Sequence, residues 1–381
     1  MEQASLIIGN GNWAVKSGSL LGYTMFNEQF YPQYVTASRA TTSTRVDENG
    51  LIVTSSIGIA RIDYSTGEAA LLVEPQRTNL LTYSEDFGVW GITPAGISSI
   101  EPNYAISPEG VENAYKVNFV VQGDSDLALV KGHSVTGGST YAYSIYIKGE
   151  GSDIGKDIVV KSKRSGGGDS AGTTTTQTLT GEWVRVDFTT TYAANNTATT
   201  FRISSNDATS CLIYGAQAEE GSYATSYIPT YGTSVTRNAE QYDKVITSLV
   251  PDATTFTWEV DFIVPEFAGG GGEFFGRNAA GTIQLRLYAN NNGIIRFRVE
   301  SGPQNYDTAV SVGDTAKCIF RCSSGVVSAF YNGVKIHTFT GVTMDFGKIS
   351  FGIPVTSPKI IRSLVFPTAL TDAECIDLTT I

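Results

Sequence analysis

The chain has 381 residues, of which 41% are hydrophobic and 40 are glycines, whereas only 17% are charged. This composition excludes a disordered chain and a helical bundle, and it favours short strands joined by glycine-rich turns. The formal net charge is −11, so nucleic acid is not expected as a partner, because phosphate binding needs a basic surface.

Neither a membrane span nor a secretory signal is expected. No apolar run approaches the roughly 20 residues that a membrane-spanning helix needs. The first residues, MEQASLIIGN, lack the basic start and the long apolar core of a signal peptide. We therefore expect a soluble chain that is not inserted into a membrane and not exported by the ordinary route.

Residues 1–75 are expected to form an irregular N-terminal segment that contains some strands. Its start, SLIIGNGNWA at 5–14, imitates a strand followed by the G-x-G-x-x-A of a dinucleotide site. Such a site also needs a helix after the glycines, within a βαβ unit. The residues that follow, VKSGSLLGYTMF, are not a credible helix, so we reject nucleotide binding here.

Residues 76–232 show the alternation of apolar and polar residues that predicts a β-sandwich. TYAYSIYIKGE (140–150) and EWVRVDFTTTY (182–192) are the clearest strands. Trp183 is a candidate sugar platform, although we expect it to pack at the rim of the sandwich, because large apolar side chains are usually buried. GDSD (123–126) offers oxygens to a structural Ca²⁺ but lacks a full calcium-loop pattern, so we expect a turn and no cofactor.

The stretch LIYGAQAEEGSYATSYIPTYG (212–232) closes this segment. We expect it to form the last strand of the sandwich and then to pack its tyrosines back against the same module. A linker is expected at 233–243, and a second β-sandwich at 244–381, where FTWEVDFIV (256–264) predicts a strand with Trp258 in the core.

Two further elements are predicted near the end of the chain. SAFYNGVKIHTF (328–339) carries Asn-Gly between alternating runs, which predicts a tight hairpin with Ser328 opposite His337. No carboxylate falls on that face to orient the ring, so we do not interpret this pair as catalytic, and His133 has the same weakness. TALTDAECIDL (368–378) predicts a short helix capped by Thr371.

The carboxylate pair and the cysteines of the chain also do not indicate a catalytic or metal-binding site. Glu259 and Asp261 share a face of their strand, but exposed carboxylates in strands are commonplace, and no enzyme activity is expected. A glycan-degrading enzyme stays open as an alternative that rests on this pair. The four cysteines are expected to be buried and reduced, without a disulfide or zinc site. They are Cys211, Cys318, Cys322 and Cys375.

The most suggestive binding candidates lie on a hairpin predicted around ANNNG (289–293). Its polar side gathers arginines, which on an acidic protein could bind anionic sugars or another subunit. The alternative, equally favoured, is that Glu259, Asp261 or Glu300 neutralises them across the sheet. The candidate ligand-binding residues are Arg277, Arg286, Tyr288, Asn290, Asn292, Arg296, Arg298 and, from the first sandwich, Trp183.

Several phrases of the chain resemble a class of bacteriophage tail and virion-surface proteins. They are SRATTSTRVDENGLI (38–52), LLVEPQRTNLLTYSEDF (71–87), VTGGSTYAYSIYIKGEG (135–151) and GEWVRVDFTTT (181–191). In that class a carbohydrate-binding-module-like jelly roll follows the EPQRTNLL phrase and closes with a phrase similar to GAQAEEGSYATSYIPT. From Thr254 onward the chain is similar to concanavalin-like or laminin-G-like sandwiches, through FYNGVKIHTF and IRSLVFPTALTDAE.

The resemblance implies an all-β virion appendage, of tail-fibre or head-fibre type, made in the bacterial cytoplasm and assembled on the virion. Its two tandem jelly-roll sandwiches would attach to glycans of the host surface, and its N-terminal segment would dock to other virion proteins. It also implies a homo-oligomer, commonly a trimer. The main alternative is a purely structural capsid or tail component that binds only other virion proteins.

Overall fold

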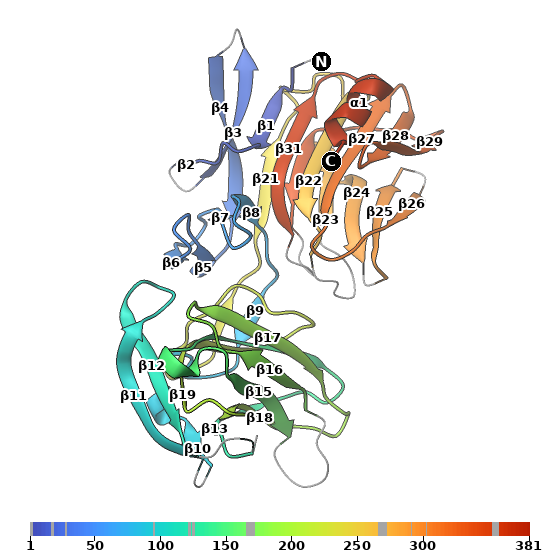
Figure 1. Cartoon of the computed structure of the whole chain (residues 1–381). Coiled ribbons are helices and arrows are strands. Elements are labelled where there is room, and N and C mark those ends of the chain that lie inside the picture. The colour runs from blue at the N-terminus through green and yellow to red at the C-terminus, as the bar shows by residue number, and fades with distance from the viewer. Residues whose placement is uncertain are drawn as a thin grey trace. The chain divides into compact units, whose positions relative to one another are not determined.

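The computed structural model describes residues 3–16, 19–26, 29–93, 96–120, 123, 126–164, 172–265, 273–290, 292–301, 303–352 and 358–381. The chain divides into two compact units. Unit 1 consists of Met1–Glu48, Ser55–Gln76 and Asn238–Ile381, and unit 2 consists of Asn49–Thr54 and Arg77–Arg237. Both are built almost wholly from antiparallel strands (Figure 1), which confirms the expected all-β class of sandwich folds.

Unit 1 contains two sheets and a short helix. The strands of the first sheet are β1 (Leu6–Gly9), β2 (Val15–Lys16), β3 (Ser19–Phe26), β4 (Gln29–Ser38), β7 (Arg61–Asp63), β8 (Ala70–Leu72), β22 (Phe256–Ile263), β27 (Thr315–Ser323), β28 (Val326–Tyr331), β29 (Val334–Phe339) and β31 (Lys359–Phe366). The strands of the second sheet are β21 (Gln241–Val245), β23 (Glu273–Arg277), β24 (Ile283–Asn290), β25 (Ile294–Val299), β26 (Gln304–Ala309) and β30 (Lys348–Phe351). The remaining elements are β5 (Ser43–Val46) and the helix α1 (Asp372–Thr379).

The two sheets of unit 1 are joined by a shared strand. The first sheet runs in the order β29–β28–β27–β22–β31–β1–β3–β4, with β2 on β3 and the pair β7–β8 on β31. The second runs in the order β26–β25–β24–β23–β30–β21–β4. Because β4 pairs with both β3 and β21, it connects the two layers of the sandwich.

Apolar side chains from both sheets fill the space between them. In β22, Trp258, Val260 and Phe262 point into this core and are each 1% exposed, as the alternation of the sequence predicted. Trp258 stacks on Phe320 of β27, with ring centroids 6.4 Å apart, and Phe297 of β25 meets Phe320 edge-on at 5.3 Å. Burying a side chain of this size contributes roughly 1.5–3 kcal/mol, so the interior of the sandwich accounts for most of the stabilisation of unit 1.

The helix α1 covers part of the outer face of the first sheet (Figure 1). It begins after Thr371, whose hydroxyl accepts a hydrogen bond from the backbone N–H of Glu374 at 3.2 Å. The carboxylate of Glu374 in turn accepts from the backbone N–H of Thr371 at 2.9 Å, which completes a capping box. The predicted cap and helix are therefore confirmed. Cys375 of α1 packs against Phe330 of β28 in a small apolar cluster.

The first 48 residues do not stand apart but complete both sheets of unit 1. Leu6 of β1 pairs with Val365 of β31, and Ser38 of β4 pairs with Gln241 of β21. The chain is thus divided differently from the consecutive segments expected from the sequence, which were 1–75, 76–232, 233–243 and 244–381. The reason is that pairing between strands hundreds of residues apart leaves no local pattern in the sequence.

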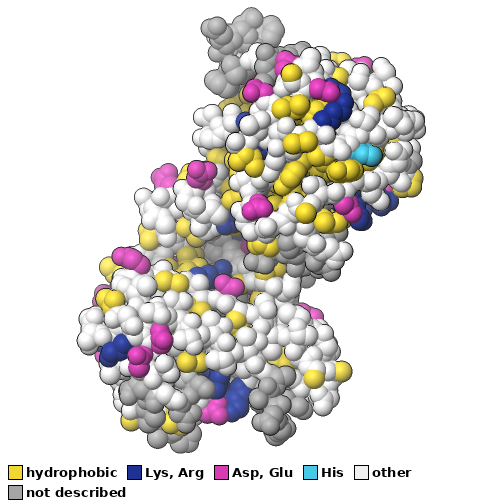
Figure 2. Space-filling view, turned by 45° about the vertical axis from the view of Figure 1, so that its right-hand side comes forward, with side chains coloured by type: hydrophobic (Ala, Val, Ile, Leu, Met, Phe, Trp, Pro, Cys, Tyr) yellow, Lys and Arg dark blue, Asp and Glu magenta, His cyan; other side chains and the backbone are white. Residues whose placement is uncertain are grey.

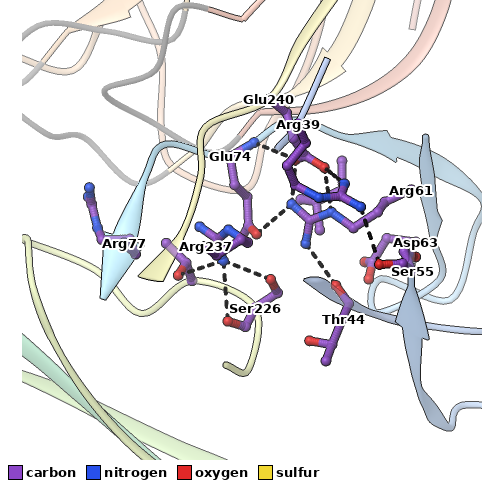
Figure 3. A network of polar contacts seen from close by, with 12 residues as sticks. Arg39, Thr44, Ser55, Arg61, Asp63, Glu74, Arg77, Ser226, Arg237 and Glu240 are labelled. Carbon is purple, nitrogen blue, oxygen red and sulfur yellow. Dashed lines mark hydrogen bonds and ion pairs between the residues drawn. The ribbon is translucent and has the colours of Figure 1, made fainter. Parts of the chain in front are cut away.

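A buried network of charged side chains ties separate segments of unit 1 together (Figure 3). Arg61 donates from Nε to Glu240 at 2.7 Å, from Nη2 to Glu74 at 2.7 Å and from Nη1 to the carbonyl of Thr44 at 2.7 Å. Arg39 also donates to Glu240. Burial alone would lower the pKa of Arg61, but the carboxylates of Glu240 and Glu74 raise it above its ordinary value. The two arginines are therefore matched by two carboxylates inside the fold.

Unit 2 is a second sandwich, inserted between the parts of unit 1 along the chain. The strands of one sheet are β10 (Gly91–Ile92), β13 (Leu129–Ser134), β15 (Asp157–Arg164), β16 (Thr174–Thr178) and β18 (Ala198–Ser205). Those of the other are β11 (Ile97–Ile106), β12 (Glu112–Phe119), β14 (Thr140–Lys148), β17 (Val184–Thr191) and β19 (Ser210–Glu220). The remaining elements are β6 (Ile52–Ser55), at whose end the two units meet in the sequence, β9 (Arg77–Asn79), β20 (Val235–Arg237), η1 (Phe87–Val89) and η2 (Gly151–Asp153).

The core of unit 2 lies between its two five-stranded sheets, ordered β10–β13–β18–β15–β16 and β11–β12–β19–β14–β17. Tyr143 of β14 stacks on Phe188 of β17 with centroids 5.1 Å apart, and Phe201 of β18 contacts both rings. Since Phe201 belongs to one sheet and the other two rings belong to the opposite sheet, these contacts hold the two layers together. The short strands β9 and β20 form a separate two-stranded sheet, with Thr78 opposite Thr236.

The tyrosine-rich stretch after β19 folds back onto unit 2, as the sequence predicted. Tyr227 is 1% exposed, and its ring lies 5.7 Å from that of Tyr214 and 6.5 Å from that of Tyr146. Its hydroxyl lies 2.7 Å from the hydroxyl of Ser84 and donates to the carboxylate of Glu85 at 2.9 Å. These rings therefore serve as packing for the closing strand of the sandwich.

The hairpin of β28 and β29 forms as predicted, but its register differs. Asn332 and Gly333 both have positive φ, 43° and 79°, as a tight two-residue hairpin turn requires. An irregularity in the pairing shifts the strands so that Ser328 lies opposite Thr338 and Ala329 opposite His337. The predicted pairing of Ser328 with His337 is therefore wrong, because a bulge changes which residues face each other.

The cysteines are as expected from the sequence, since all four are buried and none forms a disulfide. Burial raises the pKa of the Cys322 thiol to about 11, which keeps it protonated. None of the helices in the described ranges has both the length and the apolar character needed to span a bilayer.

Candidate functional site

Four arginines and a tyrosine lie on the outer face of the second sheet of unit 1. Arg286 and Tyr288 project from β24, and Arg296 and Arg298 project from the neighbouring β25, paired as Arg286 with Arg298 and Tyr288 with Arg296. Arg277, at the end of β23, completes the group, which we call the arginine face. The alternate residues of the hairpin are buried in the core, namely Leu285, Leu287, Ala289, Ile295, Phe297 and Val299. This alternation is what places the polar side chains outside.

Arg296 is fully engaged by its neighbours on the arginine face. It forms two parallel contacts with Asp307 of β26, from Nε at 2.6 Å and from Nη2 at 2.7 Å, and its Nη1 donates to the hydroxyl of Tyr288 at 3.2 Å. Asp307 lies directly opposite Arg296 in the strand register. The hydrogen bonds from Arg296 lower the pKa of Asp307 below its ordinary value. The guanidinium group of Arg296 is therefore already paired with a carboxylate of the protein itself.

Arg286 and Arg298 share one carboxylate. Glu300 accepts from Nε of Arg298 at 2.9 Å, and its Oε1 lies 3.0 Å from Nε of Arg286. The sequence offered Glu259, Asp261 or Glu300 as acids that neutralise the arginines, and only Glu300 does so. Asp307, the second acid, was missed because it comes from a strand whose pairing with β25 had not been predicted.

The aromatic ring of Phe275 in β23 lies beneath two of the arginines. The guanidinium carbon of Arg277 is 4.5 Å from the ring centroid, and that of Arg286 is 5.4 Å away. Phe275 is fully buried although it points away from the core of the sandwich. Such cation–π contacts hold the guanidinium groups against the sheet, so the face is preorganised. The sequence EFFGR gave no sign of this, since its two phenylalanines have no alternation.

The other predicted ligand residues lie elsewhere. Asn292 is exposed in the turn between β24 and β25, and the side chain of Asn290 lies outside the described residues. Trp183 belongs to unit 2, where its indole N–H donates to the carbonyl of Ile106 at 3.0 Å. Its ring packs against a cluster that includes Tyr214. The structure therefore brings Trp183 to the rim of unit 2 and not to the arginine face.

The carboxylate pair of β22 is buried, so the expectation that it is exposed is wrong. Glu259 is 0% and Asp261 4% exposed, and Nη2 of Arg362 contacts both, at 2.9 Å in the case of Asp261. The same Nη2 donates to the carbonyl of Leu378 in α1 at 3.4 Å. Burial raises the pKa of both acids, and for Glu259 the charge of Asp261 adds to this effect. Their position between a central strand and the helix keeps them from solvent.

Both histidines are held by aromatic neighbours. His337 stacks on Tyr306, with centroids 4.9 Å apart, and meets Phe339 edge-on at 4.6 Å. His133 contacts the hydroxyl of Tyr143 at 3.1 Å, and burial lowers its pKa to about 4. Ser328 is 1% exposed and accepts a hydrogen bond from Arg321 at 3.1 Å. No nucleophile–base pair is formed by these residues.

The candidate calcium turn at 123–126 lies partly outside the described residues, because 124 and 125 are not described. The described Asp126 is surrounded by cations, with Lys161 and Lys163 each 2.6 Å away. These lysines lower the pKa of Asp126 to about 2. Within the described ranges, no group of three or more His, Cys, Asp or Glu side chains is placed to hold a metal ion.

No protein-family model matches the chain, and no curated protein matches it. Among solved structures, it is similar to the CBM40 of Ruminococcus gnavus IT-sialidase bound to alpha2,3 sialyllactose, at 17% identity over 35% of this chain and 86% of that one, with a TM-score of 0.28. It is also similar to Trypanosoma rangeli sialidase in complex with the inhibitor DANA, at 12% identity over 36% of this chain and 26% of that one, with a TM-score of 0.32.

A third similar structure is the CBM22-1-CBM22-2 tandem domain of Paenibacillus barcinonensis Xyn10C, at 10% identity over 77% of this chain and 98% of that one, with a TM-score of 0.29. The CBM40 and CBM22 structures are carbohydrate-binding modules, and the match to the trypanosomal sialidase spans about a quarter of that protein. With TM-scores this low, the three likenesses carry no argument about what this chain does.

Proposed function

We propose that this protein is a glycan-binding appendage of a bacteriophage virion and that the arginine face of unit 1 contacts glycans of the host surface. The observation that carries the proposal is the preorganised outer face of β24 and β25. There four guanidinium groups and a tyrosine ring are fixed by a buried ring and two carboxylates. Sugar sites combine aromatic surfaces with a few planar hydrogen-bonding groups, and this face offers both.

The charge of the face supports an external ligand. Its described side chains carry four positive charges, from Arg277, Arg286, Arg296 and Arg298, against two negative charges, from Glu300 and Asp307. The whole chain is acidic, at −11, so the charge of these described side chains differs in sign from that of the chain as a whole. Basic side chains lie beside acidic ones elsewhere on the surface as well (Figure 2), and around Asp126 the cations Lys161, Lys163 and Arg202 also outnumber the acid.

The role on a virion is supported by the resemblance of several sequence phrases to phage tail and virion-surface proteins. In this proposal, the N-terminal segment of residues 1–75 carries contacts with other virion proteins, and the chain assembles as a homo-oligomer, a trimer. Several copies of a weak site then bind a host surface together, so that avidity exceeds the affinity of one face.

The test is a glycan array with the full chain, followed by competition of the bound glycans against adsorption to host cells. Arg296→Ala combined with Arg298→Ala is expected to weaken glycan binding at least tenfold, because each charge-assisted contact contributes about 1.5–3 kcal/mol. The matched control, Lys156→Ala with Lys335→Ala, removes the same charge from surface ion pairs elsewhere. No glycan bound by the wild-type chain, or equal losses in both double variants, would contradict the proposal.

A purely structural role is the second candidate, and the pairing of the arginines favours it. Asp307 and Glu300 already form ion pairs with arginines of the arginine face. A face that is partly neutralised in this way also suits a contact with a neighbouring virion protein. Sedimentation of the wild type and of the Arg296→Ala, Arg298→Ala double variant distinguishes the structural role from the glycan-binding role. A change in oligomeric mass with no glycan binding indicates the structural role.

A further inference from the structure

We infer that Arg298 is the residue of the arginine face that takes the ligand and that the ligand is a carboxylate-bearing sugar. This inference rests on the proposed function and names the substrate class of the same site. It comes from a contrast between two arginines on one strand, which have different residues opposite them on β26.

Arg296 and Arg298 project from β25 to the same side, two residues apart. On the neighbouring strand β26, Asp307 lies opposite Arg296, whereas Asn305 lies opposite Arg298. Asp307 occupies the fork of Arg296 with both carboxylate oxygens. Asn305 is exposed and carries no charge, so the equivalent position beside Arg298 lacks an internal carboxylate.

The guanidinium group of Arg298 is held by one carboxylate, and its two terminal nitrogens remain able to donate hydrogen bonds. Its Nε donates to Glu300 at 2.9 Å, and among the described residues its Nη1 and Nη2 have no hydrogen-bond acceptor. The side chain is 29% exposed, so this end of the fork is open to solvent. A planar guanidinium with two free donors matches a carboxylate in a bidentate arrangement, which a lysine cannot provide.

The local charge favours an anion at this point. Glu300 contacts both Arg286 and Arg298, so Arg298 shares its one carboxylate partner with a second arginine. The Arg296–Asp307 pair beside it is neutral. Because Nε of Arg298 already donates to Glu300, an incoming carboxylate would bind Nη1 and Nη2 end-on, whereas Asp307 binds Nε and Nη2 of Arg296. The exposed carboxamide of Asn305 can donate a further hydrogen bond to it.

The experiment measures binding of the full chain to polygalacturonate and polysialate, to fully methyl-esterified polygalacturonate and to dextran sulfate. We expect binding to at least one of the two carboxylated polymers. Esterification should abolish binding to polygalacturonate if that is the polymer bound, and dextran sulfate should bind more weakly. Arg298→Lys keeps the charge but removes the fork, and it should weaken binding about tenfold to a hundredfold.

Two substitutions exchange the internal partners. Asn305→Asp places in front of Arg298 the acid that Arg296 already has, and it should block binding to a similar degree without removing an arginine. Asp307→Asn frees Arg296 and should strengthen binding. Thermal unfolding of each variant serves as the folding control, because all three positions are on the surface.

The outcomes separate the inference from the proposed function. If the array finds neutral or sulfated glycans bound as tightly as carboxylated ones, or if Arg298→Lys and Asn305→Asp bind like the wild type, the inference is overturned while glycan binding stands. If neither carboxylated polymer binds although other glycans do, the substrate class is wrong. If no glycan binds at all, the proposed function fails as well.

Discussion

The buried carboxylate pair of β22 makes the stability of unit 1 depend on pH in an unusual direction. Glu259 and Asp261 face Arg362 of β31, with Lys317 of β27 acting on Asp261 and the carbonyl of Leu378 closing the group. The pKa of Glu259 is raised well above its ordinary value of 4.5, first by burial and then by the charge of Asp261. Replacing Glu259 by Gln removes this titration while keeping the size and hydrogen-bonding capacity of the side chain.

The direction in which the stability of unit 1 changes with pH follows from the raised pKa of Glu259. An acid with a higher pKa in the folded state stabilises the fold fully below its unfolded pKa, and this contribution is lost as pH rises through the folded pKa. One proton changes the free energy of unfolding by about 1.4 kcal/mol per pH unit. For each pH unit between the unfolded and the folded pKa, Glu259 should therefore cost unit 1 about 1.4 kcal/mol relative to Glu259→Gln.

The assay is thermal unfolding of both proteins at a series of pH values from 4 to 9. At pH 4 the two melting temperatures should agree, and above it the variant should melt higher by about 3–6 °C for each pH unit up to the folded pKa, since about 2–4 °C corresponds to each kcal/mol in a unit of this size. Asp345→Asn, at an exposed carboxylate, is the control and should follow the wild type. Parallel curves for wild type and Glu259→Gln, or a variant that is less stable at pH 8, would refute this reasoning.

Three further predictions concern single contacts. Glu240→Gln leaves Arg39 and Arg61 without a full counter-charge in the buried network and should lower the free energy of unfolding by about 3–5 kcal/mol in urea titrations; a loss below 1 kcal/mol would contradict it. Tyr227→Phe removes a buried hydroxyl and should cost unit 2 about 1–3 kcal/mol by calorimetry, so an unchanged transition would count against it. Thr371→Ala removes the helix cap and should cost about 1 kcal/mol, with Thr371→Ser restoring stability in the same assay.

The alternation of side chains made much of the local structure predictable. The core positions of the β24–β25 hairpin followed from a period of two, as did the outward position of Arg286 and Arg298. The Asn332–Gly333 turn followed from its residue types. A bulge has no comparable signal, and for that reason the pairing of Ser328 was predicted wrongly.

Contacts between distant segments could not be predicted from local patterns. The position of β26 beside β25, which brings Asp307 to Arg296, depends on which strands pair and not on the pattern of either strand. The same holds for Glu259, whose strand reads as half exposed because a short helix that covers its polar face lies more than 100 residues further on.

The pairing of β1 with β31 has a consequence for synthesis on the ribosome. Unit 2 is nearly continuous in sequence and can begin to fold once residue 237 has emerged. The first strand, by contrast, pairs early with β3 on one edge, but its other edge must wait until residues 362–365 have been made. Throughout that interval its unpaired edge is open to other nascent chains, so premature termination should yield a product that aggregates with one module already intact.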